Sequence, residues 1–232
     1  KTNPLAQRLS PALDALGVAS FVDPPAGLEP RRAFIDAGVL ELTAAEGEIV
    51  YQPGCEGEPL RYTKPVPLAA TTEICAQARA RGQSSPVARG LVVVEPPLQP
   101  VDETPGPPGV RYEYFEGVFS QLPDFDLLGE PARTGASATL IPDGVRPYEW
   151  GLRASGLFEA TATKVYRFTL KSGDGARLYI GNRLVVDNDG RHAPRSRTGE
   201  VALAKGLHRV RVEFFQRRGE YVLELSPFTL RQ

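Results

Sequence analysis

Short runs of alternating apolar and polar residues, separated by glycine-containing turns, dominate the second half of the chain. Four runs each place their apolar residues on one face of an extended strand: Tyr166, Phe168 and Leu170; Ala176, Leu178 and Ile180; Val210, Val212 and Phe214; and Tyr221, Leu223 and Leu225. The turns between them tolerate positive φ angles: Gly173-Asp174-Gly175, Gly181-Asn182, Asp189-Gly190, Lys205-Gly206 and Arg218-Gly219. The pattern predicts an antiparallel sandwich or barrel of about eight strands over residues 110–232.

The first half of the chain has the same period of two in shorter runs. Ile49 and Tyr51, for example, share one face of an expected strand. These runs predict a small β-sandwich over residues 27–97. The proline-rich segment 98–109 cannot pair as a central strand and is predicted to be a stiff, extended linker. We therefore expect an all-β fold of two antiparallel β-sandwich domains joined by this linker.

One short helix is predicted ahead of the two sandwiches, over residues 3–18. Four leucines recur at helical spacing: Leu5, Leu9, Leu13 and Leu16. Gly17 then favours the end of the helix. One amphipathic helix cannot bury its apolar stripe alone. Residues 1–26 are therefore interpreted as a helix and exit loop that belong to an upstream catalytic domain.

Composition excludes several classes of function. The chain has 232 residues, 41% of them hydrophobic and 24% charged, which suits two small globular domains. A formal net charge of -1 provides no basic field for a phosphate backbone, so nucleic acid is not an expected partner. No apolar run approaches the roughly 20 residues of a membrane span. The chain lacks methionine and starts at Lys1 without a leader, which we interpret as a fragment of an extracellular, cell-surface or periplasmic protein.

Two cysteines, Cys55 and Cys75, are the whole thiol inventory. A structural zinc site needs about four ligands, and the two histidines, His192 and His208, lie far from both cysteines in the sequence. The cysteines form a disulfide if the compartment is oxidising and are otherwise two separate thiols. The sequence leaves both alternatives open.

The C-terminal half resembles a known family. The runs "VYRFTLKSGDGARLYIGNRLVVDNDGRH" and "GEVALAKGLHRVRVEFFQRRGEYVLEL", preceded by "VRYEYFEGVFSQLPDF" and "YEWGLRASGLFEA", resemble the PA-fourteen domain, the protective-antigen module. That module also occurs in cell-wall adhesins and in glycosidases. The resemblance implies a β-sandwich whose loops at one end can hold calcium and a sugar.

The calcium site that the resemblance implies is altered here. Calcium-dependent lectin members of the family chelate the ion with two successive aspartates, and this chain has Gly173 and Asp174 at those positions. A hard cation prefers about six or more oxygen ligands, so the loss of one carboxylate should weaken or abolish the site. We therefore expect no cofactor, with calcium held by Asp174 and Asn188 as the alternative.

The N-terminal half carries a second resemblance. "RLSPALDALGVASFVDPPAGL" is similar to the closing helix and exit loop of family-twenty glycoside hydrolases, the β-N-acetylhexosaminidases. "GVLELTAAEGEIVYQPG" and "YTKPVPLAATTEICAQARARGQSSPVA" are similar to the small C-terminal β-domain of that family. The Thr-Asp-Gly turn common in the family is replaced by residues 52–57. This resemblance implies that the parent chain is a hexosaminidase.

The best candidate ligands for a sugar are the polar residues of the predicted turns: Asp174, Asp187, Asn188 and Asp189. Carboxylates and amides on converging loops offer acceptors to calcium and to sugar hydroxyls. The alternative is that these side chains accept backbone N–H groups as Asx turns.

Two further residues are candidates for carbohydrate binding. His192 follows the Asp-Gly turn and either lines the glycan groove or pins the loop by a hydrogen bond. Trp150, the only tryptophan, either stacks on a sugar ring or lies in the core. His208 shares strand parity with Val210 and is expected to face the core.

No catalytic constellation is evident in the sequence. Family-twenty catalysis uses an adjacent Asp-Glu pair deep in a barrel, and Asp102-Glu103 lies instead in the proline-rich linker, where we interpret it as solvated charge. We therefore predict a non-catalytic C-terminal accessory segment of a carbohydrate-active enzyme, whose PA-fourteen-like domain binds glycan or shapes substrate access to the parent active site. Its expected partners are a glycan or the upstream catalytic domain of the same polypeptide. The alternative is a structural or adhesion spacer that contacts protein without binding sugar.

Overall fold

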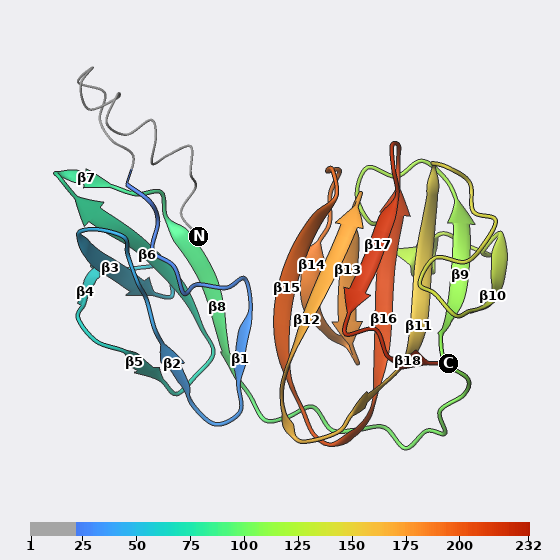
Figure 1. Ribbon diagram of the computed structural model, residues 1–232, viewed down its shortest axis with the longest axis horizontal. Coiled ribbons are helices and arrows are strands. Elements are labelled where there is room, and N and C mark those ends of the chain that lie inside the picture. The colour runs from blue at the N-terminus through green and yellow to red at the C-terminus, as the bar shows by residue number, and fades with distance from the viewer. Residues whose placement is uncertain (1–21) are drawn as a thin grey trace. The chain divides into compact units, whose positions relative to one another are not determined.

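The computed structural model describes residues 22–232 and consists almost wholly of strands and loops (Figure 1). The one helical element in this range is a short 3-10 turn, η1 (Phe125–Leu127). The all-β prediction is confirmed, and the helix predicted over residues 3–18 lies outside the described residues. Across residues 22–232, no helix combines the length and the apolar character that a membrane crossing requires.

The chain divides into two compact units. The described part of the N-terminal unit comprises residues 22–28, 39–68 and 72–91, and the C-terminal unit comprises residues 29–38, 69–71 and 92–232. Strand β1 (Arg32–Phe34) thus belongs to the C-terminal unit, where it pairs in parallel with residues 92–94.

The strands of the N-terminal unit form one larger sheet and one strand pair. The sheet runs in the order β1-β8-β6-β3-β4, with β7 on β6, and β2 pairs with β5; β1 and residues 92–94 of β8 belong to the C-terminal unit. Their bounds are β2 (Gly38–Leu40), β3 (Glu48–Pro53), β4 (Leu60–Tyr62), β5 (Val66–Leu68), β6 (Thr72–Ala80), β7 (Gln83–Ser84) and β8 (Ala88–Val94). Ile49 and Tyr51 of β3 lie opposite Ala78 and Ala76 of β6, and all four side chains are buried. The face that they share is the one that the alternation predicts.

A disulfide joins Cys55 and Cys75 in the N-terminal unit, with their Cα atoms 4.9 Å apart. Cys55 lies in the turn after β3 and has a positive φ of 59°, whereas Cys75 lies within β6 opposite Gln52. The bridge therefore ties the β3–β4 turn to the neighbouring strand. Of the two alternatives for the cysteines, the structure has the disulfide.

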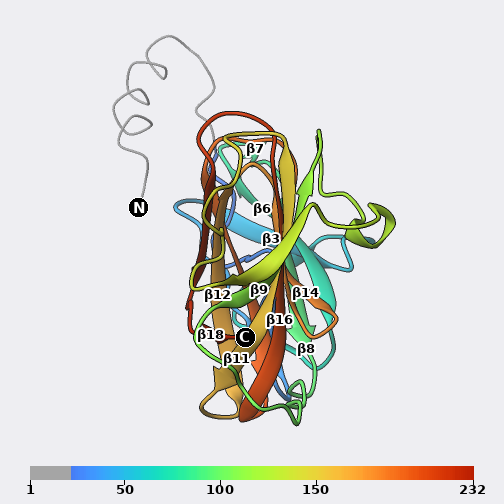
Figure 2. The ribbon, with the colours of Figure 1, turned by 90° about the vertical axis from the view of Figure 1, so that its right-hand side faces the viewer.

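The C-terminal unit is a two-layered β-sandwich. Its larger sheet runs β10-β9-β11-β16-β13-β14, with β18 on β11, and its smaller sheet runs β15-β12-β17. Figures 1 and 2 show the smaller sheet as a separate layer across the larger one. The bounds are β9 (Val110–Glu116), β10 (Arg133–Ser137), β11 (Trp150–Ala160), β12 (Lys164–Gly173), β13 (Ala176–Ile180), β14 (Arg183–Asn188), β15 (Arg195–Leu203), β16 (Gly206–Gln216), β17 (Val222–Ser226) and β18 (Leu230–Arg231).

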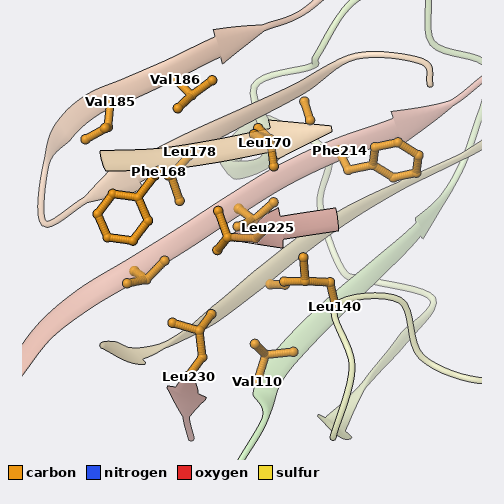
Figure 3. Packing of buried hydrophobic residues seen from close by; sticks show 14 of the residues in the cluster. Val110, Leu140, Phe168, Leu170, Leu178, Val185, Val186, Phe214, Leu225 and Leu230 are labelled. Carbon is orange, nitrogen blue, oxygen red and sulfur yellow. The ribbon is translucent and has the colours of Figure 1, made fainter. Parts of the chain in front are cut away.

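The core of this unit fills the space between the two layers, as the side chains in Figure 3 show. Phe168 and Leu170 of the smaller sheet face Leu178 and Phe214 of the larger one, and all four are fully buried. Burial of each such side chain stabilises the fold by about 1.5–3 kcal/mol. The alternation in the sequence identifies these core positions correctly, except that Tyr221 beside β17 is 41% exposed.

A second, smaller cluster covers one end of the outer face of the larger sheet. Phe115 and Phe215 point away from the main core because their parity is opposite to that of their buried neighbours. The loop between β9 and β10 packs Leu122 and Phe125 against them. This end of the outer face is therefore closed, while the opposite end of the same face stays open.

The proline-rich segment lies along the C-terminal unit as part of it. The Leu98 N–H donates to the Ala202 carbonyl and the Val101 N–H to the Leu207 carbonyl, both at 2.8 Å. Figure 1 shows the segment passing along one end of the strands. Prolines keep it extended, and its remaining amides bond to strand ends, so it does not act as a free spacer.

Candidate functional site

The loops at one end of the sandwich bring the predicted ligands together, with Asp174 as their most buried carboxylate. Asp174 follows a cis peptide bond between β12 and β13 and is 7% exposed. Its Oδ1 accepts the His192 N–H at 3.2 Å, and its Oδ2 accepts the Arg217 N–H at 2.9 Å. Both carboxylate oxygens therefore fasten neighbouring loops by amide hydrogen bonds.

Asn188, at the end of β14, connects three strands from a fully buried position. Its Nδ2 donates to the Ser172 Oγ at 2.8 Å, and its Oδ1 accepts from the Arg195 Nε at 2.8 Å. Its backbone carbonyl accepts from the His192 Nε2 at 2.8 Å. His192 therefore pins the loop by a hydrogen bond, which is the second of the two alternatives that the sequence leaves open for this residue.

Asp187 and Asp189 hold the β14 turn from both sides. The Asp187 Oδ1 accepts the Asp189 N–H at 3.0 Å, and the Asp189 Oδ1 accepts the Leu122 N–H at 2.9 Å. Arg177 lies 3.3 Å from the Asp187 Oδ2 and 3.2 Å from the Asp189 Oδ2. Burial alone would lower the pKa of Arg177, but its hydrogen bond to Asp187 and the two negative charges raise that pKa overall.

These contacts do not suit a calcium ion. The ion prefers about six or more oxygen ligands, and here the Asp174 oxygens face N–H donors while the Asn188 oxygen faces a guanidinium. Among residues 22–232, no group of three or more His, Cys, Asp or Glu side chains could hold a metal. The four turn residues converge, but what their geometry supports is the bracing of loops.

Trp150 belongs to the core and cannot stack on a sugar at the surface. It is fully buried, and its ring packs against Phe214, Tyr221 and Tyr114 at centroid distances of 5.1, 5.9 and 5.7 Å. The inclusion of Trp150 among the carbohydrate-binding residues is therefore wrong. Trp150 shares the inward face of β11 with Leu152 and Ala154, which places its ring in the core.

His208 is also buried, as its parity predicts, and its Nε2 lies 2.8 Å from the Ala204 carbonyl. Glu103, interpreted as a solvated linker charge, instead pairs with Arg209, whose Nε lies 2.6 Å from the Glu103 Oε1. The pair fixes the proline-rich segment to β16.

The outer face of the larger sheet carries a band of alternating charge next to the phenylalanine cluster. Five residues that lie opposite one another on five strands form this band: Glu113, Arg153, Glu213, Arg177 and Asp187. The Arg153 guanidinium lies 3.3 Å from Glu113 and 3.8 Å from Glu213. Burial raises the pKa of Glu213, and the nearby Arg211 and Arg153 offset this only in part.

Beyond this charged band the outer face opens into a groove of about 830 Å³. The proline-rich segment and the β13–β14 turn flank it, and Arg111, Ser155 and Arg211 line it. Sequence parity places each of these three outside the core. The sequence does not specify the cross-strand register that makes these three residues neighbours. They are therefore not among the candidate site residues that the sequence predicts.

Comparison with known proteins identifies the C-terminal unit. A family model described as the PA14 domain matches residues 106–227, which are 122 of the 232 residues. No curated protein matches the sequence. The hexosaminidase resemblance of the N-terminal half stays a prediction.

Solved structures that match this chain include two PA14 domains and one enzyme. The PA14 sugar-binding domain from an RTX adhesin is similar over 55% of this chain and 100% of its own, with 15% identity and a TM-score of 0.43. The PA14 domain of the MpAFP antifreeze protein is similar over 56% and 90%, with 18% identity and a TM-score of 0.44. The β-glucosidase from Kluyveromyces marxianus is similar over 45% of this chain and 14% of its own, with 18% identity and a TM-score of 0.35. Because the family model covers more than half of the sequence, the chain belongs to the PA14 domain family.

Proposed function

We propose that the C-terminal unit binds carbohydrate and serves a carbohydrate-active enzyme as a non-catalytic accessory module. The family match over residues 106–227 is the observation that carries this proposal. The open groove on the larger sheet supports it, because its volume of about 830 Å³ suits a short oligosaccharide. Binding there would hold a polymeric substrate near the catalytic domain of the same polypeptide.

The parent enzyme that we propose is a β-N-acetylhexosaminidase. The support is the resemblance of the N-terminal segments to the tail of family-twenty glycoside hydrolases. We also propose an extracellular, cell-surface or periplasmic location. The disulfide between Cys55 and Cys75 supports this location, because such bonds persist in oxidising compartments.

A glycan array probed with the full chain tests the proposal. Binding to one or more glycans, with saturation in calorimetry, is the expected outcome. Parallel measurements in calcium and in EDTA should agree, since the loop oxygens already accept protein hydrogen bonds. Absence of binding to every glycan in both buffers would remove the carbohydrate-binding proposal.

The second candidate function is a spacer or adhesion module that contacts protein. Two exposed apolar residues of the β9–β10 loop favour it, Val118 at 62% and Leu127 at 82% exposure. A double substitution, Val118→Ser with Leu127→Ser, tests it by cross-linking within the full-length precursor. The spacer function predicts the loss of specific cross-links from this loop, whereas glycan binding predicts unchanged sugar affinity in the same variant.

A further inference from the structure

The floor of the groove is positively charged and is formed by one row of residues that lie opposite one another on neighbouring strands. Arg111 of β9 lies opposite Ser155 of β11, and Ser155 lies opposite Arg211 of β16. The neighbouring band alternates acid and base, but this row holds two arginines and no acid. Strands are spaced about 4.8 Å apart, so the two arginine Cα atoms are separated by about 10 Å. Arg111 and Arg211 thus flank Ser155 on the floor of the groove.

The two arginines differ in how they are held. The Arg211 Nε lies 3.1 Å from the Glu213 Oε1, and its guanidinium stacks 4.3 Å from the centroid of the Tyr179 ring. The Arg111 side chain is exposed and has no hydrogen-bond or ion-pair partner among residues 22–232. One arginine is thus fixed in place, and the other carries a charge that no carboxylate of the described chain neutralises.

The walls of the groove offer different chemistry from its floor. The Glu103–Arg209 pair supplies a carboxylate that can accept hydrogen bonds, and the Ser155 hydroxyl is exposed. Leu98, Val101 and Leu157 add apolar surface beside these polar groups. Sugar rings combine hydroxyl edges with apolar C–H faces, and a groove with both kinds of surface can bind both.

From this arrangement we propose that the groove binds an acidic saccharide, with its carboxylate or sulfate on Arg111 and Arg211. Guanidinium groups bind such oxyanions through paired, charge-assisted hydrogen bonds. Glu103 and Ser155 then bind hydroxyl groups of the same sugar or of its neighbour. The proposal rests on the carbohydrate-binding function above and names both its ligand class and its site.

Calorimetry with the full chain and three saccharides tests the proposal. The probes are an oligogalacturonate, which carries carboxylates only, a carrageenan oligosaccharide, which carries sulfates only, and an uncharged chito-oligosaccharide. At least one acidic probe should bind more tightly than the uncharged one, and its affinity should fall with added salt. The two acidic probes distinguish a carboxylate ligand from a sulfate ligand.

Variants locate the site. Arg111→Gln should weaken binding of the acidic probe by about tenfold or more, because it removes a charge-assisted hydrogen bond. Ser155→Glu, at an exposed position, should abolish binding by placing a carboxylate between the two arginines. The matched control is Arg197→Gln, an exposed arginine on β15 of the other sheet, which should bind within about twofold of the unmodified chain.

The outcomes separate the two proposals. Equal affinity of Arg111→Gln and the unmodified chain for the acidic probe would overturn the groove assignment. Binding of the uncharged probe alone, unaffected by either groove variant, would also overturn it while leaving carbohydrate binding intact. No binding of any saccharide would overturn both.

Discussion

Asp174 shows at the level of one residue why a turn carboxylate need not be a ligand. Its two oxygens each accept an amide hydrogen from a different loop, at 3.2 Å from the His192 nitrogen and 2.9 Å from the Arg217 nitrogen. Both contacts involve residues distant in the chain, so they are tertiary hydrogen bonds rather than a local turn. The residue type predicts an acceptor, and only the fold decides which donors reach it.

Asp174→Asn should destabilise the C-terminal unit by about 1–3 kcal/mol, because an amide NH₂ would then face a backbone N–H in a buried position. Urea unfolding followed by Trp150 fluorescence measures this, since the only tryptophan lies in the same unit. Asp187→Asn is the control. Asp187 is exposed, so the loss of its ion pair should cost about 0–1 kcal/mol. A thermal midpoint that calcium raises in the unmodified chain but not in Asp174→Asn would contradict the bracing role.

Glu213 makes stability depend on pH in a defined direction. Burial raises its pKa in the folded state above the unfolded value of about 4.3. Its contribution to the free energy of unfolding is therefore fully present below the unfolded-state pKa and is lost as pH rises through the folded-state pKa. Glu213→Gln does not titrate, so its melting temperature relative to the unmodified chain should increase as pH rises from about 4 toward neutrality.

Thermal melts of the unmodified chain and of Glu213→Gln across this pH range, in low and in high salt, check the prediction. The trend should persist in high salt, because it originates in burial rather than in screened surface charge. A relative melting temperature that falls with rising pH would show that ion pairing with Arg211 and Arg153 outweighs burial.

At the level of elements, alternation predicts the strands of this chain and turn chemistry predicts where they end. Phe168 and Leu170 are core residues because a strand of period two must bury one face, and the sequence is sufficient for that inference. Cross-strand register is different. Arg111, Ser155 and Arg211 become neighbours only through the pairing of three strands, which single-strand parity does not specify.

The same limit explains the errors at the candidate site. The turn residues Asp174 and Asn188 do converge as predicted, but the donors that occupy their oxygens come from other loops and strands. Trp150 lies in a strand whose alternation is clear, yet its parity alone does not show that Phe214 and Tyr221 enclose it. Residue type therefore shows which side chains can accept hydrogen bonds or pack, whereas tertiary contacts determine which partners they meet.

The disulfide is an element-level feature with a measurable consequence for one unit. Cys55 and Cys75 are 20 residues apart, and closing a loop of that size stabilises by about 3 kcal/mol. Replacing both by serine should therefore raise hydrogen exchange in β3 and β6. Peptides from β12 and β16, in the other unit, serve as the internal reference and should exchange as before. Equal increases in both units would contradict the assignment of the stabilising effect of the disulfide to the N-terminal unit.

At the scale of the whole molecule, the C-terminal unit has its hydrogen-bonded loops at one end of the larger sheet and the proposed saccharide-binding groove at the other. One end of its larger sheet is closed by the phenylalanine cluster and the braced loops, and the other end carries the groove. The charged band between them is internally paired, so it adds little attraction for a ligand. The uncompensated charge of Arg111 gives the groove a cation that an acidic saccharide can pair with.

Backbone amide chemical-shift mapping of the full chain with an acidic oligosaccharide tests this separation most directly. The largest shifts should lie at Arg111, Ser155 and Arg211 and at the non-proline residues of 98–104, while the amide signals of Asp174 and Asn188 stay unchanged. Shifts centred on Asp174, Asn188 and His192 instead would contradict the assignment of recognition to the groove.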